Sequence, residues 1–130
     1  MMALSEKKRM LTNPYMSHNG IELFQDENGR FLTKVEVEPL HHNPFGYVHG
    51  GLYYTMADIV AGATAREHGN TPVTLDSDFH YLSNVSSGTI TARASIVRTG
   101  NTIAVIRVEI TSDTGTLLVE GTFTYYYINN

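Results

Sequence analysis

The stretch from Leu52 to Ala65 constrains the fold of this chain more than any other part of its sequence. It reads LYYTMADIVAGATA, and Asp58 is its only ionisable group apart from two tyrosines. A segment this apolar predicts a buried helix, which we place at about residues 50–67. A carboxylate inside a buried helix is costly to desolvate unless a partner or a function compensates for it. Asp58 is therefore the first candidate for a functional residue.

The start of this predicted helix has unusual chemistry, because it reads His49-Gly50-Gly51. The first N–H groups of a helix have no partner within the helix, and glycine lets other groups approach them closely. The helix dipole also favours negative charge at this end. One helix thus offers an anion-stabilising end and, about two turns further along, a lone carboxylate.

Strand patterns lie on both sides of the helix. Residues 20–25 and 31–38 flank a turn signal and predict a hairpin. Four long segments rich in Thr, Val, Ile and Tyr follow the helix and are separated by turn signals, at residues 72–83, 88–99, 102–112 and 116–128. In the third of them, one face consists of apolar residues that we expect in the core: Ala104, Ile106, Val108 and Ile110.

The predicted fold class is α+β, with one antiparallel sheet curled around one long buried helix. We expect residues 1–130 to form a single domain, since the length suits one core and the composition does not change along the chain. A helix that is apolar nearly all round needs cover on several sides. Either the sheet wraps it tightly or a second subunit covers the remainder.

Several local features give further predictions. A short helix is expected at residues 3–11, ended by Asn13-Pro14, and Gly69 is expected to cap the long helix. Period-two alternation places Asp76 and Asp78 on the same strand face as Thr74, which we interpret as a solvated face. His41 and His42, in the loop at residues 39–48, are expected to face solvent.

Composition excludes several classes of function. The net charge is −4 and the basic residues are scattered, which argues against nucleic-acid binding. The absence of cysteine excludes disulfides, thiolate metal sites and a cysteine nucleophile. The spacing of His41, His42 and His49 matches no recognised metal site, and we expect neither a metal nor a cofactor. No leader pattern is visible and the longest apolar run is too short to span a bilayer, so a cytoplasmic protein without membrane contact is expected.

Motifs spread along nearly the whole chain suggest a family. They are Asn13-Pro14, Gly20-Ile21, Asn43-Pro44, His49-Gly50-Gly51, Ala57-Asp58, Thr74-Leu75-Asp76 and Tyr81-Leu82. With these motifs the chain resembles hotdog-fold acyl-CoA thioesterases of the phenylacetate-pathway (PaaI-like) branch. The combination of His-Gly-Gly with the later Asp and with Asn six residues before the His is specific, whereas His-Gly-Gly alone is weak.

The resemblance implies a role for each residue. Asp58 would be the nucleophile or the base that activates water, and the Gly50 N–H would stabilise the oxyanion. Asn43 would help to hold the substrate carbonyl or the water. His49 would brace the loop and support Asn43. Thr74 stands where some relatives have a water-orienting hydroxyl.

The resemblance also implies an assembly and a substrate. Asp58 would come from one subunit and the Asn43, His49 and Gly50 groups from its partner, in a homodimer that joins through the sheet and commonly pairs into a homotetramer. The substrate would be an acyl-CoA with an aryl or medium-chain acyl group, and Tyr53, Tyr54 and Phe79 are candidates to shape its pocket.

The sequence departs from the family at the expected CoA contacts. Relatives often carry a basic residue just after the Tyr-Leu pair, whereas this chain has Ser83-Asn84-Val85-Ser86. Candidate CoA contacts are therefore Tyr81, Leu82, Asn84 and, as a substitute cation, Arg98.

Structural and functional alternatives stay open from the residues alone. Asp58 could be a structural group bonded to backbone or to Tyr53 or Tyr54, and Asn43 could serve only the turn before Pro44. The competing functions are a non-catalytic acyl-CoA or acyl-carrier-binding module, a dehydratase on the same fold and a purely structural dimer. The His-Gly-Gly motif disfavours dehydration, and Asp58 argues against a purely structural role.

Overall fold

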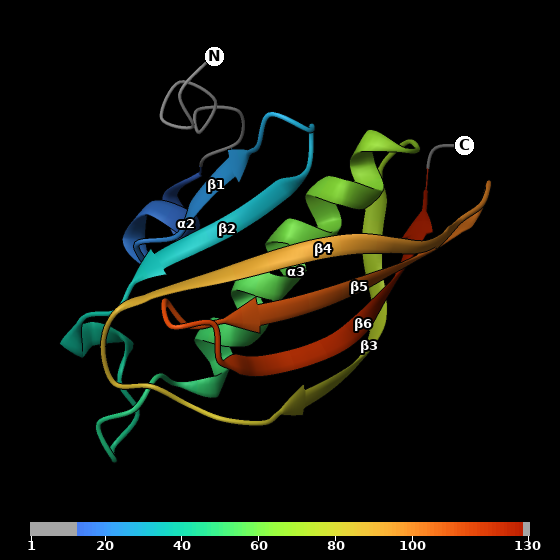
Figure 1. Ribbon diagram of the computed structural model, residues 1–130. Helices are drawn as coiled ribbons and strands as arrows, with labels where there is room; N and C mark the ends of the chain where they lie inside the picture. The colour runs from blue at the N-terminus through green and yellow to red at the C-terminus, as the bar shows by residue number, and fades with distance from the viewer. Residues whose placement is uncertain (1–12, 129–130) are drawn as a thin grey trace.

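A computed structural model describes residues 13–128 and has one six-stranded sheet around one long helix (Figure 1). The strands are β1 (Glu22–Gln25), β2 (Phe31–Glu36), β3 (Pro72–Tyr81), β4 (Thr89–Thr99), β5 (Ile103–Thr111) and β6 (Leu117–Tyr127). All neighbours pair antiparallel, in the order β1-β2-β4-β5-β6-β3. The predicted α+β architecture and all six strands are confirmed.

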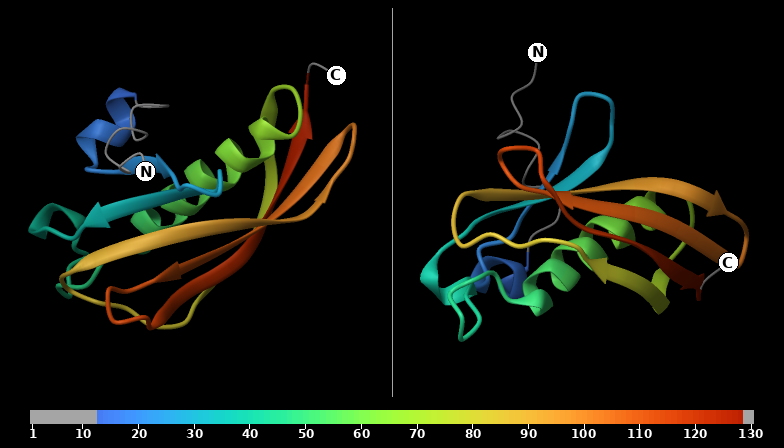
Figure 2. Two further views of the ribbon diagram at one scale, coloured as in Figure 1. Left: turned by 45° about the horizontal axis from the view of Figure 1, so that its top comes forward. Right: turned by 60° about the horizontal axis from the view of Figure 1, so that its bottom comes forward.

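The long helix, α3 (Gly50–Glu67), begins and ends as predicted and lies along the concave face of the sheet (Figure 2). His49 caps its start, because the Nδ1 atom accepts a hydrogen bond from the Gly51 N–H at 3.2 Å. One side of the helix is fully buried against the sheet, at Met56, Ala57, Val60 and Ala61. The opposite side, which includes Asp58 and Ile59, is only half-buried.

The end of α3 corrects one prediction. His68 is the C-cap, and its N–H donates to the Ala65 carbonyl at 3.1 Å. Gly69 does not adopt a positive φ, so it is not a left-handed cap. A Cβ atom at Gly69 would overlap the ring of Tyr127, and the glycine therefore permits close approach of the chain to that ring.

The concave face of the sheet is the core, as the alternation in β5 predicted. Its four apolar side chains are all fully buried: Ala104, Ile106, Val108 and Ile110. In β6 the same alternation buries Phe123, Tyr125 and Tyr127. Burial of this apolar face against α3 supplies the main stabilisation of the fold, at about 25 cal/mol per Å² removed from water.

Two predictions concern helices near the N-terminus. The helix expected at residues 3–11 lies outside the described residues. The pair Asn13-Pro14, expected to end that helix, starts α2 (Pro14–His18). Asn13 is the N-cap and accepts from the Met16 N–H at 3.0 Å, and Pro14 stands at the first helical position, where its missing N–H costs nothing.

The loop before α3 also differs from expectation at one histidine. It contains a 3-10 turn, η2 (Pro39–His41), and a single bridge between His42 and Val48. His41 is buried, not exposed, because its ring accepts from the Glu38 N–H and hydrogen-bonds the Asn19 carbonyl, each within 3 Å. Burying this ring ties the loop to the turn that follows α2.

A bulge in β3 overturns the predicted face for its acidic residues. Thr74 pairs with Tyr125, but Asp76 pairs with Thr124, so the register shifts by one residue between them. Cross-strand partners share a face of the sheet, and the extra residue therefore turns Asp76 to the side opposite Thr74. Thr74 faces the helix, while the two aspartates face away from it.

The two edges of the sheet are unequal. The edge strand β1 has four residues, whereas β3, at the other edge, has ten and, among residues 13–128, pairs only with β6. Leu75 and Tyr81 of β3 are 58% and 53% exposed. A long edge with unpaired backbone groups and apolar side chains is suited to pairing with another strand.

Within residues 13–128, no helix is long and apolar enough to cross a membrane.

Candidate active site

Asp58 lies where α3, β3 and β6 meet. One carboxylate oxygen, Oδ1, accepts from the Tyr125 hydroxyl at 2.7 Å and from the Thr74 hydroxyl at 2.8 Å. The alternative that Asp58 bonds Tyr53 or Tyr54 is wrong. Those hydroxyls instead meet Asn84 and Ser77, each at 2.7 Å. Thr74 therefore contacts Asp58 directly, and the β3 bulge is what turns it there.

Tyr125 was missed as a site residue by reasoning from sequence. Its hydroxyl oxygen also lies 2.9 Å from the Asp58 carbonyl oxygen, so its single proton is shared between the side chain and the backbone of that residue. Burial, followed by the negative charge of Asp58, raises the pKa of the Tyr125 phenol well above its usual range. The alternation in β6 could have predicted that Tyr125 points inward. That it meets Asp58 could be learned only from the tertiary structure.

A cavity of about 410 Å³ opens beside Asp58. Its walls come from α2, β1, the half-buried side of α3, the start of β3 and β6, and include Gly62, Arg66, Thr74 and Tyr125. Small residues in α3 leave the space open, and Arg66 supplies a positive charge two turns beyond Asp58. The carboxylate therefore faces a space that can admit a ligand or solvent.

The start of α3 forms a second, separate group of candidates. None of residues 13–128 accepts a hydrogen bond from the Gly50 N–H. The Tyr81 ring lies beside Gly50, and its hydroxyl donates to the Gly50 carbonyl at 3.2 Å. The N–H of Gly50, at the positive end of the helix dipole, is thus available to a ligand oxygen.

Asn43 and His49 are held by local bonds. The Asn43 Oδ1 atom accepts from the N–H groups of Phe45 and Tyr47, at 2.9 and 3.2 Å, which is the turn chemistry considered as an alternative. His49 caps the helix through Gly51 and, in the described part of the chain, does not hydrogen-bond Asn43. The amide nitrogen of Asn43 has no hydrogen-bond acceptor among residues 13–128.

These two groups are too far apart in one chain to act on one carbonyl. Gly50 and Asp58 are eight residues apart in α3, which corresponds to about 12 Å along the helix axis. The structure brings Asp58 together with Thr74, but it does not bring Gly50 to them, and Asn43 and His49 are each held by bonds within their own loop or helix start.

The candidate CoA contacts are also divided. Tyr81, Leu82 and Asn84 lie near the start of α3, whereas Arg98 pairs with Val105 at the opposite end of the sheet. Asn84 is occupied structurally, since it accepts from the Tyr53 hydroxyl and donates to the Val48 carbonyl at 3.0 Å. Burial raises the pKa of Tyr53 to about 12, so this hydroxyl keeps its proton and remains a donor.

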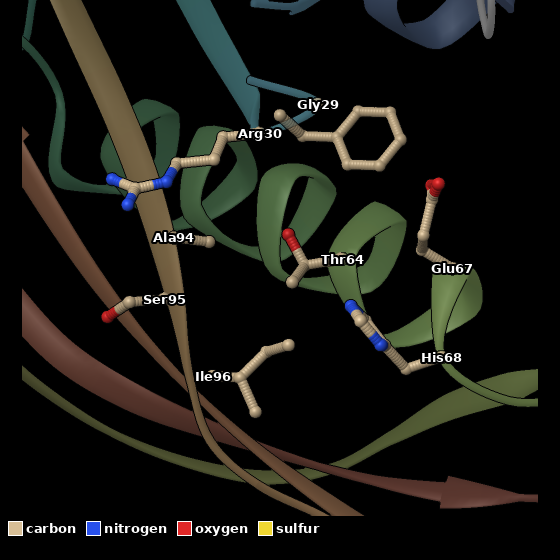
Figure 3. Close-up of a pocket in the computed structure, with 9 residues that line it drawn as sticks. Gly29, Arg30, Thr64, Glu67, His68, Ala94, Ser95 and Ile96 are labelled. Carbon is tan, nitrogen blue, oxygen red and sulfur yellow. The ribbon is translucent and has the colours of Figure 1, made fainter.

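A further cavity, of about 250 Å³, lies between the β1–β2 turn, the end of α3 and β4 (Figure 3). Arg30, Thr64, His68 and Ile96 are among its lining residues, and none of the predicted site residues is. Among the described residues, no group of three His, Cys, Asp or Glu side chains is arranged to hold a metal ion.

Comparison with known proteins identifies the family. Residues 45–119 match the model of the thioesterase superfamily. The 1,4-dihydroxy-2-naphthoyl-CoA hydrolase of Listeria monocytogenes is 31% identical over 102 residues, which is 76% of this chain and 83% of that protein.

Two solved structures resemble this chain in both fold and sequence. A Bacillus halodurans protein solved with CoA has a TM-score of 0.86 and 28% identity, covering 98% of this chain and 86% of that one. A mutant of the phenylacetic acid degradation protein PaaI from Thermus thermophilus has a TM-score of 0.82 and 26% identity, covering 89% and 100%. The hotdog fold is thereby confirmed, and the chain belongs to the PaaI-like branch of the thioesterase superfamily as an enzyme that hydrolyses thioesters.

Proposed function

We propose that this enzyme hydrolyses acyl-CoA thioesters, with Asp58 as the base or nucleophile and the Gly50 N–H as an oxyanion donor. The observation that carries the proposal is the state of Asp58: its Oδ1 is held by two hydroxyls, and it borders a cavity. The Listeria relative named as a CoA hydrolase and the Bacillus neighbour solved with CoA support this class of substrate.

The chemistry needs only groups that the chain provides. With Asp58 as base, its carboxylate takes a proton from water as the water oxygen bonds to the thioester carbonyl carbon. The Gly50 N–H and the helix dipole stabilise the oxyanion that forms. The C–S bond then breaks, the electron pair leaves on the CoA sulfur, and the proton passes from Asp58 to that sulfur, which gives free acid and CoA.

With Asp58 as nucleophile, its oxygen bonds to the carbonyl carbon, the C–S bond breaks and CoA leaves as the thiolate. Water then hydrolyses the resulting anhydride to the free acid and restores the carboxylate, and the proton released goes to the CoA thiolate. Thr74, which donates to Asp58, holds the carboxylate by either route. Asn43, with an amide that faces no acceptor among residues 13–128, is suited to donate to the substrate carbonyl or to the water.

The separation of about 12 Å between Gly50 and Asp58 favours a site shared between two subunits. We infer that a homodimer joins through the free edge of β3 and places the Gly50 N–H of one subunit near Asp58 of its partner. We also propose that such dimers pair into a tetramer and that the protein is cytoplasmic.

The acyl group is proposed to be aryl or medium-chain. Tyr54 and Phe79 lie in an aromatic cluster beside the exposed side of α3, with their ring centroids 5.5 Å apart. Phe79 also meets Tyr81, near the helix start, at 5.3 Å. These rings follow the helix from the Gly50 end toward Asp58 and can contact an apolar acyl group.

The test is release of CoA across a panel of acyl-CoAs, followed with a thiol-reactive dye and comparing wild type with Asp58→Asn. The chain has no cysteine, so the protein itself does not react with the dye. We expect kcat to fall by roughly 10²–10⁴-fold in the variant. Unchanged hydrolysis in a folded Asp58→Asn protein would show that the mechanism is wrong. Absence of hydrolysis with every substrate in wild type, together with measurable acyl-CoA binding, would instead support the binding-module alternative.

A further inference from the structure

Tyr125 contacts Asp58 but does not border the start of α3, where the oxyanion would form. Its hydroxyl lies 2.7 Å from Oδ1 and 2.9 Å from the backbone carbonyl of Asp58. Thr74 approaches the same Oδ1 atom at 2.8 Å. Among residues 13–128 no hydrogen-bond donor meets the other carboxylate oxygen, Oδ2. The two oxygens of Asp58 are therefore not equivalent.

The position of the Tyr125 hydroxyl is fixed by packing. The side chain is 2% exposed, and its ring stacks on Phe123 with centroids 6.4 Å apart and planes 21° apart. The burial of the ring and its stacking on Phe123 therefore hold the phenol beside Asp58.

We propose that Tyr125 is a positioning residue that, together with Thr74, holds Oδ1 of Asp58 and leaves Oδ2 as the oxygen that acts on the substrate. The inference rests on the proposed function of Asp58. Because the raised pKa of the phenol keeps its proton in place, Tyr125 acts as a donor throughout the neutral range. Hydrogen bonds donated to a carboxylate also stabilise its ionised, active form.

Other charged or titratable groups around Asp58 are few in the described structure. Tyr54 lies one turn earlier in α3, Arg66 lines the cavity two turns later, and Tyr125 approaches from β6. From β3 the group that meets Asp58 is Thr74, which does not titrate. Removing the Tyr125 hydroxyl therefore changes the hydrogen bonding of the carboxylate and leaves these other charges in place.

The test compares Tyr125→Phe with wild type by kcat, KM and the pH dependence of kcat, using the acyl-CoA that wild type hydrolyses best. We expect kcat to fall about tenfold with little change in KM, since one charge-assisted hydrogen bond is lost. The acid limb of the profile should move to higher pH, because the ionised carboxylate has lost a donor.

Tyr127→Phe is the matched control. Tyr127 lies in the same strand, is 1% exposed and donates to the Ala65 carbonyl of the same helix at 2.6 Å. Its loss removes a buried hydroxyl without touching Asp58, so the melting temperature should fall while the acid limb stays in place. Should Tyr125→Phe behave like this control in both kcat and the acid limb, the proposed positioning role would be overturned.

A second variant keeps the test decisive if Tyr125→Phe does not fold. Incorporation of 3-fluorotyrosine at position 125 retains the ring and makes the hydroxyl a stronger donor, so the acid limb should move to lower pH. An unchanged limb would overturn the inference. Failure of the proposed function can be distinguished from failure of this inference. It would appear as full activity in Asp58→Asn, whatever the result with the Tyr125 variants.

Discussion

The two halves of the candidate site are built in different ways. Asp58, in α3, is held by side chains from two other elements, because Thr74 comes from β3 and Tyr125 from β6. The helix-start half is held by bonds within a few residues, as in the Asn43 turn and the His49 cap. One half is thus fixed by the core, while the other presents donors for which residues 13–128 offer no acceptor. In the proposed function these donors act on a substrate bound between two subunits.

The largest effect on the helix-start half is expected from Gly50→Pro. Proline removes the N–H, is tolerated at the first position of a helix and suits the extended conformation of His49 before it. Loss of one oxyanion donor typically lowers kcat by about 10²–10³-fold. The measurement is steady-state hydrolysis, with the helix content checked by circular dichroism.

Gly50→Ala is the control for added bulk at this position. Its Cβ would lie 3.3 Å from the exposed ring of Tyr81, which can shift slightly, and the N–H is retained. We expect a much smaller loss of kcat than with proline. Equal losses in the two variants would mean that bulk, and not the missing donor, is responsible, and the oxyanion role of Gly50 would be contradicted.

A mixture of two inactive variants tests both halves of the candidate site in one experiment. If each site takes Asp58 from one subunit and Gly50 from the other, then Asp58→Asn and Gly50→Pro chains refolded together form heterodimers with one intact site. Random pairing makes half of the dimers mixed, so about a quarter of wild-type activity should return. Activity that stays at the level of the separate variants would argue that each site lies within one subunit.

A smaller effect is expected at Asn43, where the turn and the donor can be separated. Asn43→Asp keeps the Oδ1 acceptor for Phe45 and Tyr47 and removes the free amide donor. We expect about a tenfold fall in kcat with an unchanged melting temperature, whereas Asn43→Ala should lower both. Full activity in Asn43→Asp would show that Asn43 serves only the turn.

The sequence predicted the parts of the fold that depend on local pattern. Apolar composition placed α3 and singled out Asp58 within it, while strand-forming residues between turn signals placed all six strands. It failed where a single residue changes the register or where contacts are distant. The bulge after Thr74 reversed the face of Asp76, because period-two reasoning cannot detect one inserted residue. The contact between Tyr125 and Asp58 joins residues 67 positions apart, and no local pattern encodes it.

The smallest effect is expected at His49, and it separates a structural cap from an acid–base role. The Nδ1 atom accepts from the Gly51 N–H, and the backbone N–H of His49 bonds the His41 carbonyl at 2.9 Å. His49→Ala should lower the free energy of unfolding by about 1 kcal/mol, a shift of a few degrees in melting temperature. His49→Asn retains a side-chain acceptor at the cap and should restore most of this loss. Because asparagine cannot exchange protons as imidazole does, full hydrolysis in His49→Asn would assign His49 to the cap, and a large fall in kcat at unchanged stability would assign it to the chemistry.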